Sequence, residues 1–337
     1  MPEIGSEFWD VPIGNVPNGL FEEPTRFFLS GRAGLSFIIK DIFARQSVTT
    51  AALPSWCCDS MILPFLEAGL EVKFYTVLPC DGGVVQRYEE AEDCDIILDM
   101  DYFGYDSSSV ARNFRGVVIR DLTHSFFSRN YDDADYYFGS MRKWAGFYTG
   151  GFARKANGDF ITASSQETDC EYVALRKSAM AKKREYILGN TNSKDYLETF
   201  GIAEERLEKT DILGAVPEDV EKMKLMDLQL VKKRRRDNAE YLLKQFSDIA
   251  VFPSLSGNEC PLFVPILVPD GKRNELRRYL IENEIYCPVH WPLSEYHRIT
   301  EKAKEIYDNE LSLVCDQRYE LSDMERVAET IKNFWRE

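Results

Sequence analysis

The middle of the chain carries an ordered set of side chains that could do chemistry together: Asp121, His124, Ser140, Lys143 and Gly150-Gly151. A lysine amine can form a Schiff base with the aldehyde of pyridoxal phosphate (PLP). A carboxylate beside the pyridine nitrogen keeps that nitrogen protonated, so that the ring can act as an electron sink. The set therefore indicates a PLP site in which Lys143 holds the cofactor and Asp121 faces its ring nitrogen.

A phosphate group needs hydroxyls and backbone amides, and two parts of the sequence can supply them. Ser140 offers a hydroxyl three residues before Lys143. The turn Gly31-Arg32-Ala33-Gly34 precedes apolar residues at helical spacing, so its amides should open a helix and point at an anion. Each piece has an ordinary alternative: Asp121 could cap the next turn, Lys143 could be a surface lysine, and the glycines could open a helix without a ligand.

The elements around this set alternate between strand-like and helix-like patterns, which is typical of an α/β fold with a mostly parallel sheet and crossover helices. A helix is predicted over Asp59–Ala68, with Gly69 as its C-terminal stop. Strands are predicted at Val48–Leu53, Val72–Val77, Ile96–Met100, Val117–Asp121, Asp135–Gly139 and Gly151–Arg154. Asp121 and Lys143 thus follow strands, where open α/β sheets place their ligands.

After about residue 157 the pattern changes to charged helices, of which Val220–Gln245 is predicted to be one long helix. Beyond it a strand at Leu262–Val268, a helix at Arg273–Asn283 and a strand at Tyr286–Val289 would form a βαβ-like unit, closed by a helix at Met324–Phe334. We therefore predict a large PLP-binding domain over residues 1–220, followed by a linking helix and a small C-terminal α/β domain over residues 221–337.

Composition limits the classes of function. The net charge of −15 argues against nucleic-acid binding, and the basic run Lys232–Arg236 is better explained as a solvated helix face. No apolar stretch approaches the roughly 20 residues of a membrane-spanning helix. The eight cysteines form no CxxC pair, which favours reduced thiols and a cytoplasmic location. The three histidines, at positions 124, 290 and 297, are too dispersed to assert a metal site.

The order of these motifs resembles the DegT/DnrJ/EryC1/StrS family of fold-type-I PLP enzymes, most of which are nucleotide-sugar aminotransferases. The resemblance lies in SGRAGL at 30–35, the segment 53–77, DYFGY at 101–105, IRDLTHS at 119–125 and FGSMRKWAGFYTGG at 138–151. Weaker similarity continues through 234–246, CPVHWP at 287–292 and 313–319. It implies the fold-type-I fold, with a mostly parallel, seven-stranded-type sheet, flanking helices and a smaller C-terminal α/β domain.

The resemblance also implies roles for single residues. Lys143 becomes the Schiff-base lysine, Asp121 the partner of the pyridine nitrogen, and His124 a residue against the cofactor ring or its phenolic oxygen. The cofactor phosphate would be bound by Ser140 and by the amides of Arg32 and Ala33. On the substrate side the resemblance gives His290 and Tyr102, although His290 could equally be a packed histidine.

Several positions depart from the family pattern. Arg32 stands where Thr or Ser is usual, Cys58 stands where an aromatic residue stacks on the cofactor, and the spacing from serine to lysine is shorter than usual. The guanidinium of Arg32 could still bind phosphate, and Trp56 could supply the stacking surface. The segment Tyr148–Gly151 replaces the usual Gly-Glu-Gly-Gly, and an Asn-Tyr-Arg segment that reaches the partner subunit is missing from the sequence.

The sequence thus predicts a PLP-dependent aminotransferase that moves an amino group from an amino acid to a nucleotide-linked keto sugar. Two alternatives stay open: another fold-type-I PLP reaction on an amino acid, or a non-catalytic protein that keeps the fold and binds a ligand. The resemblance further implies a homodimer.

Overall fold

The computed structural model describes residues 3–21, 23–107, 114–128, 133–209 and 212–336. Its contacts group into two compact units, each discontinuous in sequence. The first holds residues 7–46 and 136–228, and the second holds residues 3–6, 47–135 and 229–337. This grouping differs from the boundary after residue 220, which remains a prediction about domains.

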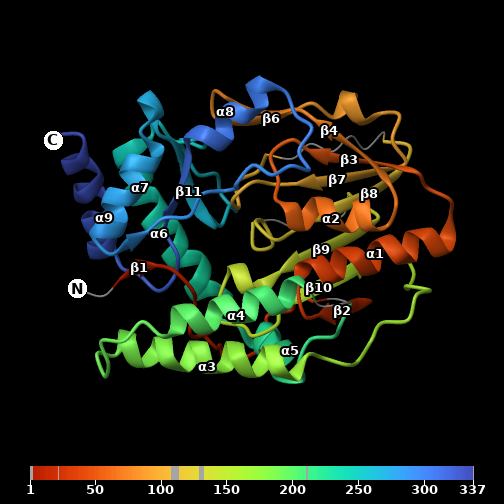
Figure 1. Cartoon of the computed structure of the whole chain (residues 1–337), viewed down its shortest axis with the longest axis horizontal. Coiled ribbons are helices and arrows are strands. Elements are labelled where there is room, and N and C mark those ends of the chain that lie inside the picture. The colour runs from red at the N-terminus through yellow and green to blue at the C-terminus, as the bar shows by residue number, and fades with distance from the viewer. Residues whose placement is uncertain (1–2, 22, 108–113, 129–132, 210–211, 337) are drawn as a thin grey trace. The chain divides into compact units, whose positions relative to one another are not determined.

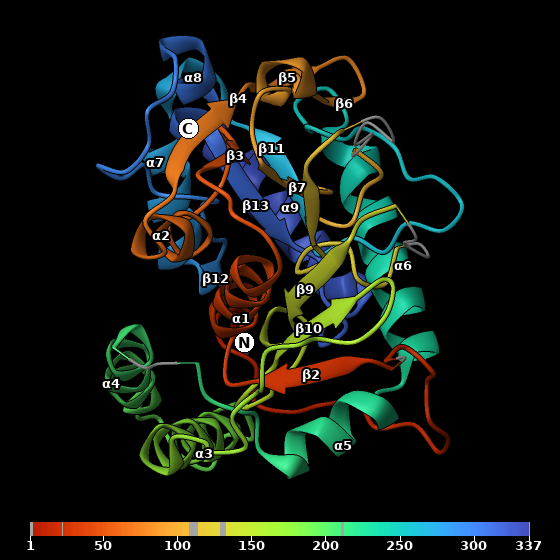
Figure 2. The ribbon, with the colours of Figure 1, turned by 90° about the vertical axis from the view of Figure 1, so that its right-hand side faces the viewer.

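The first unit contains three antiparallel strands and the helices that follow them. β10 (Gly151–Lys155) lies between β2 (Thr25–Phe28) and β9 (Tyr136–Ser140), as Figure 2 shows. The other elements of this unit are α1 (Gly31–Arg45), the 3-10 turn η2 (Met141–Lys143), α3 (Cys170–Ile187), α4 (Tyr196–Glu208) and α5 (Pro217–Leu225).

Helix α1 begins where the sequence changes from small residues to apolar ones at helical spacing. Ser30 is its N-cap, and the Ser30 hydroxyl accepts a hydrogen bond from the amide of Ala33 at 3.2 Å. The segment Gly31–Gly34, which was predicted to open a helix, is the first turn of α1. Its apolar face is buried through Leu35, Ile38, Ile39 and Ile42.

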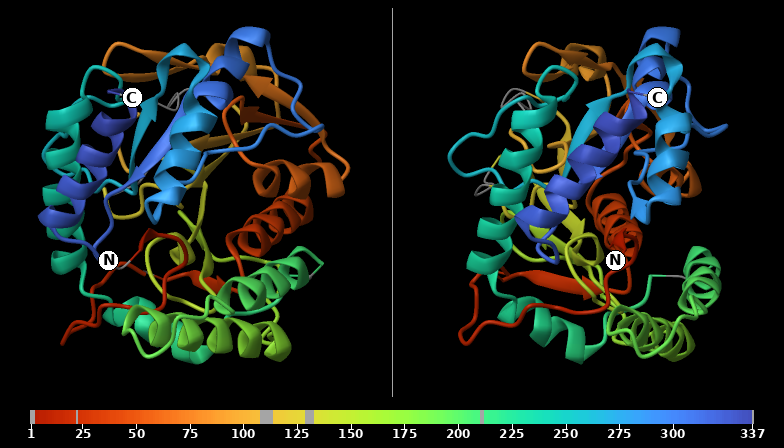
Figure 3. Two further views of the ribbon diagram at one scale, coloured as in Figure 1. Left: turned by 60° about the vertical axis from the view of Figure 1, so that its left-hand side comes forward. Right: turned by 90° about the vertical axis from the view of Figure 1, so that its left-hand side faces the viewer.

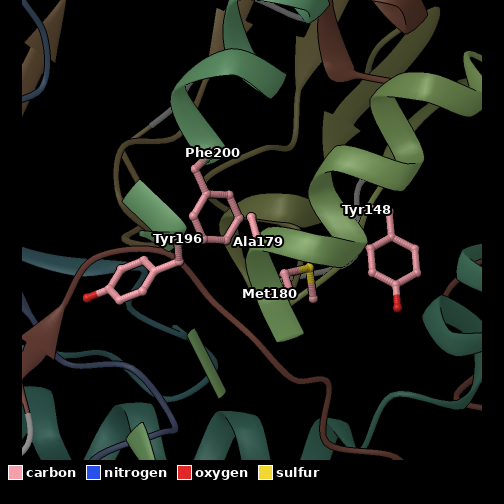
Figure 4. Packing of buried hydrophobic residues seen from close by; sticks show 5 residues of the cluster. All are labelled: Tyr148, Ala179, Met180, Tyr196 and Phe200. Atoms are coloured by element: carbon pink, nitrogen blue, oxygen red, sulfur yellow. The ribbon is translucent and has the colours of Figure 1, made fainter. Parts of the chain in front are cut away.

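Helices α3 and α4 pack against each other and against the segment that follows Lys143. Figure 1 shows α3, α4 and α5 in green near the bottom of the view. In Figure 4, Tyr196 and Phe200 of α4 lie on one side of Ala179 and Met180 of α3, and Tyr148 lies on the other. All five side chains are buried, so the packing of Tyr148 against α3 and α4 anchors the 144–150 segment.

The second unit contains a parallel sheet of the kind predicted from sequence. β3 (Thr50–Pro54) lies between β4 (Glu71–Tyr75) and β7 (Ile96–Met100), and β7 pairs with β8 (Val117–Asp121). Both β7 and β8 have the predicted bounds, and every residue of β7 is buried, as expected of a parallel strand covered on both faces. α2 (Asp59–Glu67) crosses between β3 and β4, and Gly69 after it adopts a φ of 80°.

The predicted strand Val72–Val77 is in fact divided, because β4 ends at Tyr75. A hairpin of β5 (Val77–Cys80) and β6 (Gly83–Gln86) follows, with the 3-10 turn η1 (Tyr88–Ala91) after it.

The C-terminal part of this unit differs from the predicted βαβ arrangement. β11 (Phe263–Leu267) pairs antiparallel with β13 (Glu310–Val314), whereas the short β12 (Ile285–Tyr286) pairs with β1 (Ile4–Gly5) near the N-terminus. The predicted strand Tyr286–Val289 is wrong in its extent, because the chain leaves the β12–β1 pair after Tyr286. In its described residues, this part of the unit also contains four helices and a 3-10 turn: α6 (Leu228–Phe246), η3 (Pro269–Gly271), α7 (Arg273–Glu282), α8 (Glu301–Asn309) and α9 (Leu321–Phe334). Figure 3 shows α7 beside α9 in two shades of blue.

The single long helix predicted over Val220–Gln245 is also wrong, because the chain breaks at Met226. Met226 has a ψ of 132°, which separates α5 from α6. The break is stabilised by the N-terminal segment: Gly14 donates to the carbonyl of Leu225 at 2.7 Å, and Asp227 donates to that of Pro12 at 2.9 Å. The apolar spacing continues through the break, so the sequence pattern alone hides it.

The main sheet has the strand order β2-β10-β9-β8-β7-β3-β4. The prediction of an α/β fold with a mostly parallel, seven-stranded-type sheet and flanking helices is confirmed. Across the described residues, no helix has both the length and the apolar character that a membrane span requires.

Candidate functional site

Lys143 lies at the end of β9, on the short turn η2 that leads toward β10. The turn is fixed by a hydrogen bond from the amide of Met141 to the carbonyl of Gly150 at 2.8 Å. Lys143 itself is exposed. Among the described residues its amine finds no hydrogen-bond or ion-pair partner, so Nζ is available for a covalent bond.

The N-terminus of α1 lies against Ser140. A Cβ atom on Gly31 would come within 3.2 Å of the Ser140 Cβ and 3.3 Å of the Gly139 carbonyl oxygen. A Cβ on Gly151 would lie 1.9 Å from the carbonyl oxygen of Ser30, so only glycine fits there. Ser140 and the start of α1, both predicted as phosphate contacts, therefore lie side by side. In the described part of the chain, the amides of Gly31 and Arg32 donate no hydrogen bond and can therefore serve an anion.

Two of the predicted phosphate ligands already have partners within the first unit. The guanidinium of Arg32 donates to the carbonyl of Leu207 at the end of α4, at 2.5 Å. The amide of Ala33 donates to its helix cap Ser30. The remaining anion-binding groups at this corner are the amides of Gly31 and Arg32 and the hydroxyl of Ser140.

Beside Lys143, a group of ion pairs links four segments of the first unit. Arg142 pairs with Glu204 of α4, and the buried Arg176 of α3 lies 3.2 Å from Glu204 and 3.3 Å from Glu7. Burial works to raise the pKa of Glu7, but Arg176, Arg142 and Lys143 outweigh it and lower that pKa. We call Glu7, Arg142, Arg176 and Glu204 the ion-pair group. The sequence analysis missed it, since nothing in the spacing of these residues connects them.

In the second unit, Asp121 ends β8 and is almost fully buried. Its Oδ1 accepts a hydrogen bond from the amide of Thr123 at 2.7 Å. The alternative that Asp121 caps the following turn is therefore realised in the structure, and it occupies one oxygen of the carboxylate. This contact is compatible with a second role for Asp121, which stays a prediction.

Four of the predicted residues meet in one group of rings within the second unit, in which every ring except the half-buried Trp291 is buried. We call this the aromatic cluster; it consists of Trp56, Tyr102, Phe103, His124, His290 and Trp291. Trp56 stacks on Tyr102, with ring centroids 4.6 Å apart and an interplanar angle of 13°. His124 stacks on Trp291 at 5.4 Å, and its ring lies 5.6 Å from that of His290.

Polar groups at the edge of the aromatic cluster hold its rings in place. The Trp56 indole donates to the carbonyl of His290 at 2.6 Å, and the Tyr102 hydroxyl donates to the carbonyl of Trp56 at 2.8 Å. Trp56 and Tyr102 thus bind each other in this structure, and their predicted roles toward cofactor and substrate remain predictions. Phe103 and Trp291 were missed, although each adjoins a predicted residue.

Cys58 precedes α2 and is partly exposed. Its Sγ lies 3.0 Å from the hydroxyl of Ser60. A thiol contributes no flat surface comparable to an aromatic ring, so Cys58 departs from the family pattern in shape as well as in chemistry.

Comparison with known proteins reveals similarity in structure. No family model matches the chain, and no curated protein sequence matches it. PseC from Helicobacter pylori, an aminotransferase involved in the biosynthesis of pseudoaminic acid, is 15% identical and superposes with a TM-score of 0.63 over 97% of this chain and 99% of its own. The chain has the fold of such aminotransferases.

Two further solved structures agree. A DegT DnrJ EryC1 StrS aminotransferase from Brucella abortus is 14% identical and has a TM-score of 0.61 over 92% of this chain and 85% of its own. Spr1654 from Streptococcus pneumoniae, in its PLP form, is 14% identical and has a TM-score of 0.59 over 92% of this chain and 86% of its own. The resemblance found in the sequence is thus confirmed at the level of the fold.

Proposed function

We propose that this protein is a PLP-dependent aminotransferase that moves an amino group from an amino acid to a keto sugar, with Lys143 as the residue that holds the cofactor. The observation that carries the proposal lies within the first unit: the free amides at the start of α1 and the hydroxyl of Ser140 adjoin each other, and Lys143 follows Ser140 on the same turn. An anion site next to an available lysine amine is the combination that PLP requires.

The residues at this corner fit the phosphate of PLP. Gly31 has no side chain between its backbone and Ser140. A Cβ on Gly31 would lie 3.2 Å from the Cβ of Ser140 and would crowd the space between them. The amides of Gly31 and Arg32 point out of the helix N-terminus, where the helix dipole favours a negative charge. Arg32 contributes its amide in this proposal, because its guanidinium is bound to Leu207.

When bound, PLP supplies an electron sink that stabilises negative charge at the substrate carbon. Lys143 would hold the cofactor through Nζ, and the same atom would move a proton from the substrate. Asp121, buried at the end of β8, is assigned to the pyridine nitrogen as the resemblance implies, where a carboxylate would favour the protonated ring. His124 is assigned to the cofactor ring, as the resemblance implies.

The finer parts of the proposal rest on the resemblance. They are a nucleotide-linked sugar as acceptor, an amino acid as donor, a homodimer and a cytoplasmic location. The relative from Helicobacter pylori acts in the biosynthesis of pseudoaminic acid, which supports a sugar substrate here. Loss of activity on dilution would support the homodimer.

The proposed activity can be tested in two steps. Purified protein is first mixed with PLP, and its visible absorbance is recorded before and after each common amino acid is added. A donor that changes the absorbance is then combined with keto-sugar nucleotides, and the aminated product is sought by mass spectrometry. We expect bound PLP, at least one active donor and an aminated sugar.

The possible failures have different meanings. Bound PLP that reacts with amino acids but aminates no keto sugar would favour another fold-type-I PLP reaction. A protein that does not bind added PLP would contradict the proposal and favour a non-catalytic protein of this fold. Lys143→Ala should abolish the absorbance change. Lys155→Ala should leave it unchanged, because the amine of Lys155 donates to the carbonyl of Asn157 and lies over the Tyr136 ring.

A further inference from the structure

Glu310, the first residue of β13, is fully buried and bonded through both oxygens of its side chain. Its Oε2 accepts a hydrogen bond from the backbone amide of His290 at 2.7 Å. Its Oε1 lies 2.5 Å from the hydroxyl of Ser312. That hydroxyl in turn lies 2.8 Å from Nδ1 of His290, so the three side chains form a continuous chain that ends in the aromatic cluster.

The rings of Phe103 and Phe263 lie against the ring of His290, with centroid distances of 5.2 and 5.0 Å. Burial raises the pKa of Glu310 to about 8, against smaller lowering effects from Ser312, the amide of His290 and Arg273. Nη1 of Arg273 in α7 donates hydrogen bonds to the backbone carbonyls of Tyr307 and Glu310, at 3.1 Å each, and not to the side-chain carboxylate of Glu310. The other charged or titratable groups around Glu310 and His290 are Arg277, Cys287, Asp308 and His124.

The hydroxyl of Ser312 has a single hydrogen, so the hydrogen-bonded series Glu310–Ser312–His290 has two possible proton arrangements. If Glu310 is ionised, it accepts from Ser312, and Ser312 must accept from His290, so the proton of a neutral imidazole is on Nδ1. If Glu310 is protonated, it donates to Ser312, Ser312 donates to Nδ1, and the proton of His290 is on Nε2. The backbone amide of His290 fixes the other oxygen of the carboxyl group, so the carboxyl cannot rotate out of this choice without losing that bond.

We propose that Glu310, Ser312 and His290 form a buried proton relay in which the protonation state of Glu310 decides which ring nitrogen of His290 carries the proton. Glu310 and Ser312 are then positioning residues for His290. Protonated Glu310 makes Nε2 of His290 a hydrogen-bond donor, and ionised Glu310 makes it an acceptor. The relevance of this donor to a substrate rests on the proposed function, but the relay itself does not.

The relay can be observed directly by nitrogen NMR of the full chain labelled at histidine. The chain contains three histidines, and His290→Gln identifies the resonances of His290 by their loss. In the wild type we expect the protonated nitrogen of His290 to be Nε2 below pH 8 and Nδ1 above it, following the pKa of Glu310 near 8. The spectra are recorded with and without added PLP, so a failure to bind PLP would not affect the result.

Glu310→Gln gives the sharpest expectation. Its carbonyl oxygen replaces the acceptor for the His290 amide, and its NH₂ group can only donate to Ser312. The proton of His290 should therefore stay on Nε2 at every pH. Ser312→Ala removes the connection, and the nitrogen shifts of His290 should then no longer follow Glu310.

A matched control is available at the third histidine. The hydroxyl of Ser294 lies 3.0 Å from Nδ1 of His297, and no carboxylate of the described residues bonds this hydroxyl. Ser294→Ala should shift the His297 resonances and leave those of His290 unchanged. The proposal is overturned if His290 carries its proton on the same nitrogen from well below to well above pH 8 in the wild type, or if Glu310→Gln still shows a pH-dependent exchange.

Discussion

Gly31, the first residue of α1, packs directly on Ser140, the last residue of β9, so closely that a Cβ on Gly31 would lie 3.2 Å from that of Ser140. The start of the helix and the end of the strand therefore act as one corner. Lys143 follows this corner on η2. We therefore expect a small shift of α1 to change both the free energy of unfolding and the geometry of the proposed phosphate site.

Replacing Gly34 tests how tightly α1 is packed. A Cβ at this position would lie 2.8 Å from the carbonyl oxygen of Phe152 in β10, which is backbone and cannot turn away. We expect Gly34→Ala to lower the free energy of unfolding by roughly 1–3 kcal/mol, as overpacking does. Gly201→Ala in α4 is the matched control, because its Cβ meets nothing within 4 Å, and it should raise stability by roughly 0.5–1 kcal/mol. Urea titration measures both, and an unchanged Gly34→Ala would show that α1 can move freely.

The ion-pair group should contribute to stability through its buried member. Arg176 is 1% exposed and bridges two partly exposed carboxylates, those of Glu7 and Glu204. We expect Arg176→Met to cost about 2 kcal/mol of unfolding free energy, since it removes the buried guanidinium that pairs with both carboxylates, of which Glu204 keeps its ion pair with Arg142. Arg206→Met, which removes a more exposed pair with Asp169 and Glu171, should cost at most about 1 kcal/mol. Equal losses in the two variants would contradict the role of Arg176.

Asp121 has two assigned roles that a single substitution can separate. Asp121→Asn keeps an oxygen that accepts the Thr123 amide, so the turn should survive and the melting temperature should stay close to that of the wild type. The negative charge is lost, and we expect the reaction of PLP-loaded protein with its amino donor to slow by roughly 10²–10³-fold. Stopped-flow absorbance measures the rate. A variant that reacts at the wild-type rate would leave Asp121 with the turn-capping role alone.

The buried carboxyl of Glu310 should make stability depend on pH. Its pKa is 4.5 in its ordinary environment and about 8 in the folded chain. Between these values the folded chain holds a proton that the unfolded chain has released, so stability is lost as the pH rises, and the contribution is gone above pH 8. The difference in unfolding free energy between wild type and Glu310→Gln should therefore shift steadily against the wild type from about pH 5 to pH 8. Glu301→Gln, at a side chain that is 89% exposed, should produce no such trend.

The sequence predicted the parts of the molecule that depend on short stretches. The strand bounds of β7 and β8, the stop at Gly69 and the position of Lys143 after β9 follow from apolar runs and glycines a few residues apart. The break at Met226 could not be predicted, because it is fixed by hydrogen bonds to residues 12 and 14, far away in the chain.

The same limit applies to the candidate site. The sequence predicted Lys143, Ser140 and Gly31 as site residues, because each belongs to a short motif. The ion pair of Arg176 with Glu7 joins residues whose positions show no pattern. Likewise, no motif in the sequence marks Glu310, and the pairing of β13 with β11 and the path of residues 287–291 bring it to His290.

The most direct test of the account is to find which residue holds the cofactor. Protein loaded with PLP is reduced with sodium borohydride, digested and analysed by peptide mass spectrometry. The account predicts the cofactor mass on the peptide that contains Lys143, and its absence from every peptide of Lys143→Ala. Attachment to another lysine in the wild type, or no attachment at all, would contradict it.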